Sequence, residues 1–277
     1  MALVFVPTPI GNRGDITLRA LETLRDCDLL VAEDTRVARR LFALYDLPWK
    51  PAISYREQNA KAVTPAILTR ATSGLVAVVS DAGTPALSDP GRELVVAARA
   101  AGIEVRALPG AAAFICAAVL SGFPLDDLRF GGFLPRSEGK RRDALRDALR
   151  SGATHVWYEA PHRMLATLAT FESVAPHALV FVARELTKAY EQQAFGTPAA
   201  VCAALGPVMR GEFALVLGPS QPPAAASPDV ATILAAIDEA LATGSSVPSV
   251  ARELARELGV ERARVYALAA ERKRRLR

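Results

Sequence analysis

The first 120 residues alternate short apolar runs with segments of helical periodicity, and this alternation constrains the fold more than any other feature of the sequence. Apolar runs of strand length occur at residues 2–6, 29–32, 75–80 and 105–108. Between the first two, Leu18, Leu21 and Leu24 recur at the spacing of one helix face. Strands that alternate with helices form a mostly parallel sheet covered on both faces. The sequence therefore predicts an α/β fold.

A second α/β series follows a break at residues 121–125 and predicts a second domain. Its expected strands lie at 130–134, 154–159, 179–184 and 212–217. The halves are similar in length, so we expect domains at 1–121 and 122–219 with a cleft between them. A linker rich in Pro, Ala and Ser is expected at 219–228, and a helical extension at 229–277. Its expected helices are 230–242, 248–258 and 262–275, the last two joined by a turn at Gly259. That spacing resembles a helix-turn-helix, although short helices around a glycine are common in any small bundle.

Positive charge is concentrated at the C-terminal end of the chain. Residues 247–277 contain nine Lys and Arg and four Asp and Glu, whereas the whole chain contains 33 and 29. The tail therefore carries all of the formal surplus of +4. A solvated helix face is one interpretation, and attraction to a polyanion is the other.

The sequence shows no pattern typical of a membrane span, a signal peptide, a disulfide framework or a metal site. Its apolar runs are of strand length, and the N-terminal run leads directly into a Pro-rich loop. Cys27, Cys116 and Cys202 are far apart and occur in no CxxC or CxxH pattern. We expect a cytoplasmic protein without metal.

Two loops that follow predicted strands have the composition of ligand-binding loops. VPTPIGN at 6–12 contains Gly11, which lets the main chain approach a ligand, and SDAGTP at 80–85 has small residues beside Asp81. Neither is a GxGxxG or a Walker loop, which argues against a nicotinamide or nucleoside triphosphate site. An ordinary strand-to-helix turn and helix capping are the plain alternatives. Because ligands lie beyond the carboxyl ends of parallel strands, we expect the two loops to meet at one site.

Several short motifs occur along the chain in an order that resembles a known enzyme family. The set is VPTPIGN, AEDTR (32–36), SDAGTP followed by DPG, LPG (108–110), GFLP (132–135), YEAPHR (158–163), RELTK (184–188) and GEFALVLG (211–218). In this order the motifs resemble the small-subunit ribosomal RNA methyltransferases of the tetrapyrrole methylase superfamily, strongly over residues 1–218 and more loosely over the tail.

The resemblance implies a two-domain tetrapyrrole-methylase-like fold of the class III methyltransferases, with a small C-terminal helical extension. It also implies 2′-O-ribose methylation of a cytidine in the decoding region of 16S ribosomal RNA, by a homodimer that uses S-adenosylmethionine. Carried over by position, the residues that contact the cofactor are Pro7, Thr8, Asp81, Ala82, Gly83, Thr84, Leu134, Tyr158, Glu159, Ala160, Glu212 and Phe213.

The chain departs from the family pattern at four positions. Ala111 replaces a usual Pro, Arg13 a common Leu, and Arg56 and Gln58 the histidines that usually precede the residue matching Asn59. The last two changes argue against a histidine base in that loop.

Methyl transfer to a ribose hydroxyl calls for a base or a cation that stabilises the forming alkoxide. Glu33 or Asp34 can receive the proton and Arg36 can hold a phosphate, although acidic residues also favour helix starts. His162 is either a base or a packing residue at a helix start. Lys188 can lower the hydroxyl pKa or bind phosphate, and an ion pair between Arg184 and Glu185 is the structural alternative for its cluster.

Basic residues in two segments are candidates for contact with RNA phosphates. Arg141 and Arg142 follow GFLP on an expected helix, where intrahelical ion pairs are the alternative. The tail contributes Arg272, Lys273 and Arg274 with few aromatic residues, which favours backbone binding over base stacking.

Two rival functions share part of this evidence. A methylase of a corrin or porphyrin precursor has the same core and cofactor but no use for a basic tail. A noncatalytic RNA-binding module would explain the basic tail but would give no function to the loops at 6–12 and 80–85. The sequence favours an RNA methyltransferase that acts on 16S ribosomal RNA or the small ribosomal subunit.

Overall fold

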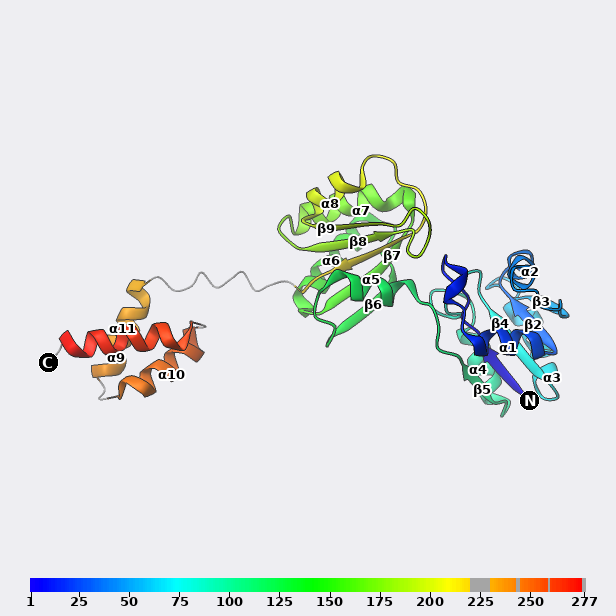
Figure 1. The fold of residues 1–277 in the computed structure, drawn as a ribbon, viewed down its shortest axis with the longest axis horizontal. Coiled ribbons are helices and arrows are strands. Elements are labelled where there is room, and N and C mark those ends of the chain that lie inside the picture. Colours follow the sequence, from blue (N-terminus) through cyan, green and yellow to red (C-terminus); the bar gives the residue numbers. More distant parts are fainter. Residues whose placement is uncertain (220–229, 243–244, 259, 276–277) are drawn as a thin grey trace. The chain divides into compact units, whose positions relative to one another are not determined.

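The chain divides into two compact units, Met1–Pro219 and Ser220–Arg277 (Figure 1). The structure is a computed structural model that describes residues 1–219, 230–242, 245–258 and 260–275. Residues 220–228 of the expected linker and the turn at Gly259 lie outside the described residues.

Five parallel strands form the first sheet, in the order β3-β2-β4-β1-β5. They are β1 (Ala2–Phe5), β2 (Leu29–Ala32), β3 (Ala52–Ser54), β4 (Leu75–Val79) and β5 (Val105–Ala107). Since β4 lies between β1 and β2, the loops that follow these three strands emerge side by side. β1 and β2 are buried throughout, which is why they read as continuous apolar runs.

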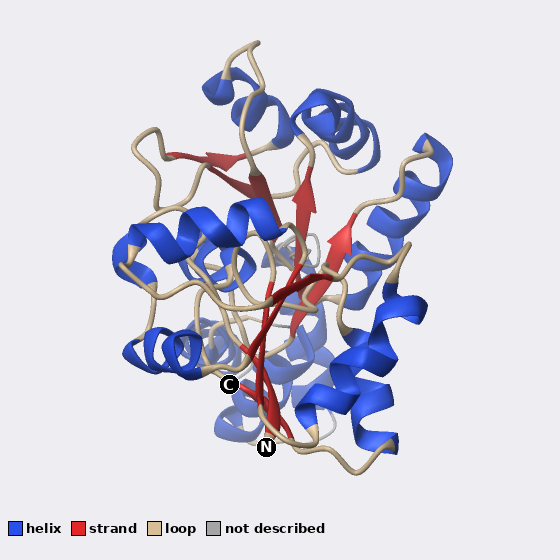
Figure 2. Ribbon diagram, turned by 90° about the vertical axis from the view of Figure 1, so that its right-hand side faces the viewer, coloured by secondary structure: helices blue, strands red, loops and turns tan. Residues whose placement is uncertain are grey.

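Helices cover both faces of this sheet (Figure 2). Val4 belongs to the core that α1 (Leu18–Asp26) and α2 (Thr35–Leu44) form on one face. Its neighbour Leu3 packs with α3 (Ala60–Ala71) and α4 (Arg92–Ala100) on the other. Thr17 caps α1 by accepting a hydrogen bond from the backbone N–H of Ala20.

The second sheet is mixed and has the order β6-β7-β10-β8-β9. Its strands are β6 (Leu128–Phe133), β7 (Thr154–Glu159), β8 (Val180–Arg184), β9 (Gln192–Gly196) and β10 (Phe213–Leu217). β6 and β7 are parallel, whereas β10 is antiparallel to β7 and β8. One face packs against α6 (Glu138–Ser151), α7 (Pro161–Val174) and α8 (Pro198–Leu205), and the other against α5 (Ala113–Ser121).

The edge strands β3 and β9 are additions that the apolar pattern does not predict. β3 has three residues, and β9 has the sequence QQAFG. An edge strand pairs on one side only and is exposed on the other, so it needs no continuous apolar run. The two sheets lie within 2–107 and 128–217, but both belong to the same compact unit, so the domain boundary at 121 stays a prediction.

The second unit contains α9 (Val230–Ala242), α10 (Val247–Leu258) and α11 (Arg262–Arg275). Ile233, Val250 and Val265, one from each helix, are fully buried in its core. In the described part of the chain no helix is both long enough and apolar enough to cross a bilayer.

Candidate active site

A pocket of about 430 Å³ opens where strand ends of the two sheets face one another. The loops after β2 and β4 form one wall, and the ends of β7 and β10 with the start of α5 form the other. Ten of the predicted site residues line it: Glu33, Asp81, Ala82, Gly83, Thr84, Tyr158, Glu159, Ala160, Glu212 and Phe213. A pocket of this size suits a small ligand of cofactor dimensions.

The pocket lining is acidic. Its carboxylates are Glu33, Asp81, Asp89, Glu159 and Glu212, and within residues 1–219 the lining includes no Lys, Arg or His. The apolar part of the lining includes Leu87, Phe133 and Leu186. Such a lining favours a ligand that carries positive charge and an apolar body, and it disfavours a phosphate.

Glu33, Asp81 and Asp89 influence one another's ionisation. Burial raises the pKa of Glu33, and the nearby charges of Asp81 and Asp89 raise it further. Burial is also the main cause of the raised pKa values of Asp81 and Asp89. Glu33 is therefore a better proton acceptor than an ordinary carboxylate, which is the property expected of a general base.

Asp34 lies next to Glu33 and has the opposite electrostatic character. It caps α2 by accepting a hydrogen bond from Arg36 N at 2.8 Å, and its side chain pairs with those of Arg36 and Arg56. The hydrogen bonds from the Arg36 side chain and then from its backbone hold the pKa of Asp34 well below its usual range. Asp34 is outside the pocket lining and caps a helix, whereas Glu33 lines the pocket.

Arg56 contacts both of these acidic residues. Its Nε donates to the Glu33 carbonyl oxygen at 3.1 Å, and its Nη2 donates to Asp34 Oδ2 at 3.3 Å. Asn59 holds the Arg56 loop by accepting a hydrogen bond from Arg56 N at 2.7 Å. Arg56, which departs from the family pattern, therefore holds the end of β2 in place. The sequence did not predict this role.

The two Gly-containing loops meet through their backbones. Thr8 N donates to the Gly83 carbonyl at 2.9 Å, and Gly83 N donates back to Thr8 at 3.1 Å. The hydroxyl of Thr84 donates to the Ala111 carbonyl at 2.9 Å, which ties this loop to the segment before α5. Pro7 and Thr8 are not part of the pocket lining, and the buried Thr8 hydroxyl has no hydrogen-bond partner among the described residues.

Gly11 lets the loop after β1 contact the loop after β8. A Cβ at this position would lie 2.5 Å from Lys188 Cγ and 3.0 Å from the Leu186 carbonyl oxygen. Asn12 N also donates a hydrogen bond to the Thr187 hydroxyl at 2.9 Å. The absence of a side chain at Gly11 is thus required for the contact between the elements of the two sheets.

Lys188 is held by two carboxylates. Its Nζ lies 2.9 Å from Glu185 Oε1 and 2.8 Å from Glu212 Oε2, and it is not part of the pocket lining. Burial lowers the pKa of Lys188, but the hydrogen bonds to Glu212 and Glu185 outweigh it and the net pKa is raised. Glu185 pairs with Lys188, whereas Arg184 Nε donates to the Arg210 carbonyl at 2.7 Å. Lys188 therefore positions Glu212 at the pocket wall and stays protonated.

The wall formed by β7 contains a buried carboxylate with structural partners. Glu159 Oε2 accepts a hydrogen bond from the Thr167 hydroxyl at 2.7 Å, and Glu159 Oε1 accepts one from Ala160 N at 2.8 Å. Arg163 Nε forms an ion pair with Glu159 Oε1 at 3.2 Å without a hydrogen bond. Next to Glu159, the Tyr158 hydroxyl accepts a hydrogen bond from Phe114 N at 3.2 Å, which links β7 to α5.

Several predicted site residues lie away from the pocket. His162 is exposed at the start of α7, outside the pocket lining, and Leu134 is buried in the core of the second sheet. Arg141 requires a correction as an RNA contact, because it is buried between α6 and α7. Its Nε donates to the Thr170 hydroxyl at 3.0 Å. Arg142 pairs with Glu138 at 2.7 Å on the surface.

In the second unit, one of the three predicted RNA contacts has an internal partner. Arg272 makes two hydrogen bonds to Asp238, at 2.7 and 2.6 Å, and thereby joins α11 to α9. Lys273 and Arg274 are exposed on α11. The bidentate pair is stabilising, so Arg272 is partly committed to the fold of the unit.

The sequence prediction missed part of the pocket. The missed residues include Leu87, Ser88, Asp89, Ala112, Phe133 and Leu186. Two of the loops they belong to contain non-glycine residues at positive φ, namely Ala86, Ser88, Glu185 and Thr187. Such backbone strain concentrates at functional sites, but no sequence pattern announces it.

Comparison with known proteins identifies the family. A model of the tetrapyrrole (corrin/porphyrin) methylases matches residues 2–202. Ribosomal RNA small subunit methyltransferase I of Synechocystis is 39% identical over 272 residues, which are 97% of each chain. The chain belongs to this methyltransferase I family. The methyltransferase I of Micromonospora olivasterospora is 41% identical over 95% of this chain and 85% of its own. That of Thermotoga maritima is 44% identical over 69% and 85%.

Solved structures confirm the fold predicted for a methyltransferase I. Diphthine synthase has a TM-score of 0.61 at 14% identity, covering 79% of this chain and 90% of its own. Cobalt precorrin-4 methyltransferase has a TM-score of 0.59 at 16% identity, covering 78% and 94%. Uroporphyrin-III C-methyl transferase from Thermus thermophilus, complexed with S-adenyl homocysteine, has a TM-score of 0.54 at 17% identity, covering 78% and 97%.

Proposed function

We propose that this chain methylates ribosomal RNA of the small subunit with S-adenosylmethionine, at the 2′-hydroxyl of a cytidine in the decoding region of 16S ribosomal RNA. The observation that carries the proposal is the acidic pocket, found in a chain whose relatives over nearly its full length are named ribosomal RNA small subunit methyltransferase I. The reaction would take place in the cytoplasm, where ribosomal subunits assemble.

The residues of the pocket fit S-adenosylmethionine. This ligand carries a positive sulfonium and a positive ammonium group, which suit Glu33, Asp81 and Asp89 of the lining. The other two lining carboxylates, Glu159 and Glu212, are already paired with Arg163 and Lys188. Its flat and apolar parts suit Leu87, Phe133 and the small residues Ala82 and Gly83. The lining residues that would hold it are those of the Asp81–Thr84 loop, Tyr158–Ala160 and Glu212–Phe213.

In the proposed reaction Glu33 takes the proton of the ribose hydroxyl. S-adenosylmethionine supplies an electrophilic methyl carbon, so that an O–C bond forms while a C–S bond breaks and leaves a neutral thioether. The raised pKa of Glu33, caused first by burial and then by Asp81 and Asp89, makes it a better proton acceptor than its neighbour Asp34, whose pKa is lowered. Asp34 and Lys188 are positioning residues, since the first caps α2 and the second holds Glu212.

Exposed basic side chains support RNA as the substrate. Arg142 on α6 and Lys273 and Arg274 on α11 are proposed to contact phosphates, and Arg36 at the start of α2 to hold a phosphate near Glu33. We keep Arg272 only as a secondary contact because Asp238 already binds it.

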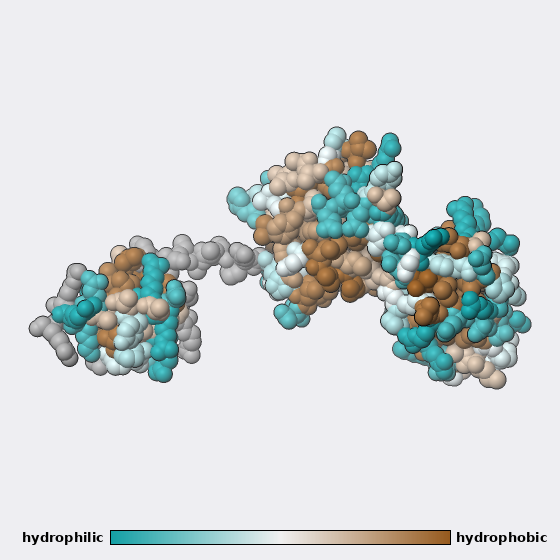
Figure 3. All heavy atoms as spheres, in the orientation of Figure 1, coloured by the Kyte–Doolittle hydropathy of each residue, from teal (hydrophilic) through white to brown (hydrophobic). Residues whose placement is uncertain are grey.

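We further propose that the chain acts as a homodimer through α5. Ala117 and Ala118 of α5 pack on the second sheet, whereas Ile115, Val119 and Leu120 are 45%, 63% and 44% exposed. Figure 3 shows apolar side chains gathered on the face of this part of the molecule. Exposed apolar side chains gathered on one helix are typical of a protein interface, and a second copy is the simplest occupant.

The test is a methyl-transfer assay with labelled S-adenosylmethionine. Small ribosomal subunits from a strain without the enzyme, naked 16S ribosomal RNA and a uroporphyrinogen-type tetrapyrrole are offered in parallel. Label on RNA in an alkali-resistant dinucleotide supports 2′-O-methylation. Label on the tetrapyrrole alone, or on a base, contradicts the proposal.

The Glu33→Gln variant tests the proposed base. We expect a rate lower by about 10²- to 10⁴-fold with unchanged affinity for S-adenosylmethionine, because the amide cannot accept the proton. The control is Glu57→Gln, the same chemical change at an exposed residue outside the pocket. A Glu33→Gln variant as active as this control would rule out Glu33 as the base.

A further inference from the structure

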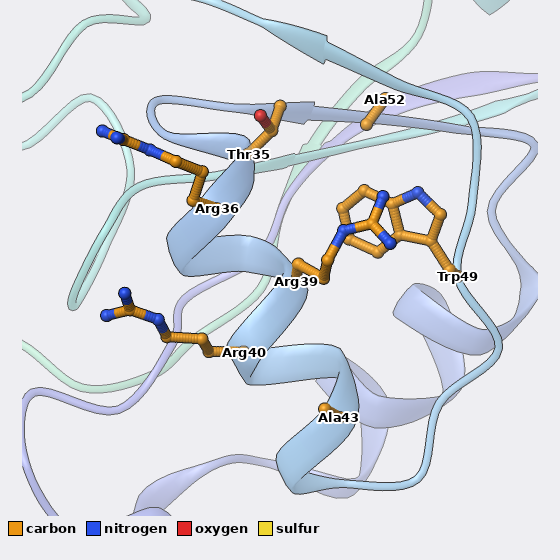
Figure 4. A pocket seen from close by; sticks show the side chains of 7 residues that line it. All are labelled: Thr35, Arg36, Arg39, Arg40, Ala43, Trp49 and Ala52. Carbon is orange, nitrogen blue, oxygen red and sulfur yellow. The ribbon is translucent and has the colours of Figure 1, made fainter.

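A basic hollow of about 630 Å³ lies beside α2, outside the acidic pocket (Figure 4). We call it the α2 groove. It is lined by Arg36, Arg39 and Arg40 of α2, by Trp49, and by the small side chains of Ala43 and Ala52. Within the described residues its lining includes no acidic side chain. The α2 groove is therefore complementary to an anion.

Two of its three arginines carry a charge that no carboxylate of the described residues pairs with. Arg39 and Arg40 are exposed, and neither forms an ion pair with any carboxylate in the described part of the chain. Arg36 shares Asp34 with Arg56, but its own side chain is 81% exposed. Figure 4 shows Arg36 and Arg40, which are four residues apart in α2, pointing to the same side of the helix. The pair thus presents two cations along one line.

Trp49 adds an aromatic surface to this groove. Its ring packs edge-on against Phe42, with centroids 5.3 Å apart, and the Arg39 guanidinium lies 4.5 Å from the Trp49 ring centroid. The indole is half-buried, so part of it remains accessible from the groove. An aromatic ring with an arginine stacked on it is a surface on which a nucleobase can also stack.

The α2 groove lies along a helix that begins two residues after Glu33 of the active-site wall. Glu33 lines the acidic pocket, Asp34 caps α2, and the arginines follow within the first two turns of the same helix. An RNA strand bound along α2 would have Glu33 just beyond the N-terminal end of the helix. Phosphates are repelled by the pocket carboxylates and attracted by the arginines, so the charges direct the backbone along the groove.

We propose that the α2 groove binds single-stranded RNA next to the target nucleotide, with phosphates at Arg36 and Arg40 and a base stacked against Trp49 and Arg39. The inference rests on the proposed RNA methylation and names the surface that positions the substrate. The combination of arginines and an aromatic ring favours an unpaired strand over a duplex, because only unpaired bases can stack on a side chain.

The first experiment measures RNA affinity as a function of salt. The full chain is titrated with a short single-stranded oligoribonucleotide, and the double variant Arg39→Ala with Arg40→Ala is compared with wild type. The double variant loses the phosphate contact of Arg40 and the stacking surface of Arg39. The slope of log K against log salt should therefore fall by about 0.7, and the affinity roughly 10-fold. The matched control is Arg70→Ala with Arg99→Ala, which removes two exposed arginines from the helices on the opposite face of the sheet.

The second experiment uses tryptophan fluorescence. The chain has two tryptophans, and Trp157 is buried, so quenching by RNA reports on Trp49. We expect quenching by the single strand, none by a duplex of the same sequence, and none in Trp49→Phe. Thermal melting shows that this variant is folded. Two results would overturn the proposal that RNA binds in the α2 groove. One is equal RNA affinity and salt slope in wild type and the α2 double variant, and the other is quenching that persists in Trp49→Phe.

The two proposals fail in different ways. If wild type methylates 16S RNA and the double variant keeps its KM, the α2 groove is wrong and the proposed function stands. If the oligonucleotide binds through Arg39 and Arg40 but no RNA is methylated, the groove stands and the proposed function is wrong. S-adenosylmethionine affinity should be the same in all these variants, which separates groove binding from damage to the pocket.

Discussion

The backbone N–H of Asp34 donates a hydrogen bond to Asp81 Oδ1 at 3.1 Å, so the residue that caps α2 is tied to the loop that follows β4. The bond orients the Asp81 carboxylate and holds Glu33, the preceding residue, at the pocket wall. Two motifs that are 47 positions apart in the sequence thereby form one acidic surface. The ionisation of this acidic surface can be measured through the pH dependence of methyl transfer.

Asp89→Asn should shift the pH dependence of methyl transfer. The proposed base Glu33 can accept a proton only when it is ionised, and its raised pKa should place the acidic limb of kcat/KM above the usual range of a glutamate. Removing the Asp89 charge lowers the pKa of Glu33, although burial continues to raise it, so the limb should move to lower pH. Glu57→Gln serves as the control. An unchanged limb in Asp89→Asn would show that another group controls the rate.

Gly11→Ala should loosen the contact between the loops after β1 and β8. The new Cβ would overlap Lys188 Cγ and the Leu186 carbonyl. We expect the free energy of unfolding to fall by about 1–3 kcal/mol in chemical denaturation, as for other overpacked sites. Gly139→Ala has no atom within 4 Å of the new Cβ and should leave stability unchanged or raise it slightly. Equal stability of the two variants would argue against the contact.

Arg141→Met and Arg142→Met separate a structural arginine from a surface one. Loss of the buried hydrogen bonds from Arg141 should cost about 1.5–3 kcal/mol of unfolding free energy, because hydrogen bonds to charged groups lie in this range. Arg142→Met removes an exposed ion pair and should change stability by less than about 1 kcal/mol. RNA affinity should fall only in Arg142→Met once the folded fraction is taken into account. The reverse pattern would contradict the placement of Arg141.

Val119→Glu should weaken the proposed dimer. A charge at a buried interface position typically costs about 2 kcal/mol or more, which raises the dissociation constant roughly 30-fold. Sedimentation velocity over a range of concentrations measures the shift. Val96→Glu is the matched control, because Val96 is 57% exposed on α4, away from α5. If the wild-type protein is monomeric at all concentrations, the proposed dimer is wrong.

The sequence predicted the buried central strands and missed two of the edge strands, β3 and β9. β1, β2 and β4 were predicted because both faces of each strand are covered, which forces a continuous apolar run. β9 was missed because Gln192 and Gln193 occupy an exposed edge. The antiparallel placement of β10 between β7 and β8 was also missed, since an apolar run does not encode which strands become neighbours.

The candidate site shows the same limit. Motifs located Glu33, Asp81, Tyr158 and Glu212, which line the pocket, but could not show that Asp34 caps a helix or that Lys188 holds Glu212. Arg141 carried a usable signal, because it shares the spacing of Leu145 and Ala148, the buried face of α6. A basic residue on an apolar helix face predicts an internal hydrogen-bond partner better than a phosphate.

The sign of the surface charge reverses at the N-terminal end of α2, between Glu33 and Arg36. A polyanion that approaches this place is attracted up to the helix and repelled beyond it. In the proposed function the phosphates would therefore stay outside the pocket, and only an uncharged group such as the ribose hydroxyl would reach Glu33. The same reversal keeps a cationic ligand inside, and it also implies that a single charge-changing substitution at the start of α2 would affect the binding of both ligands in opposite directions.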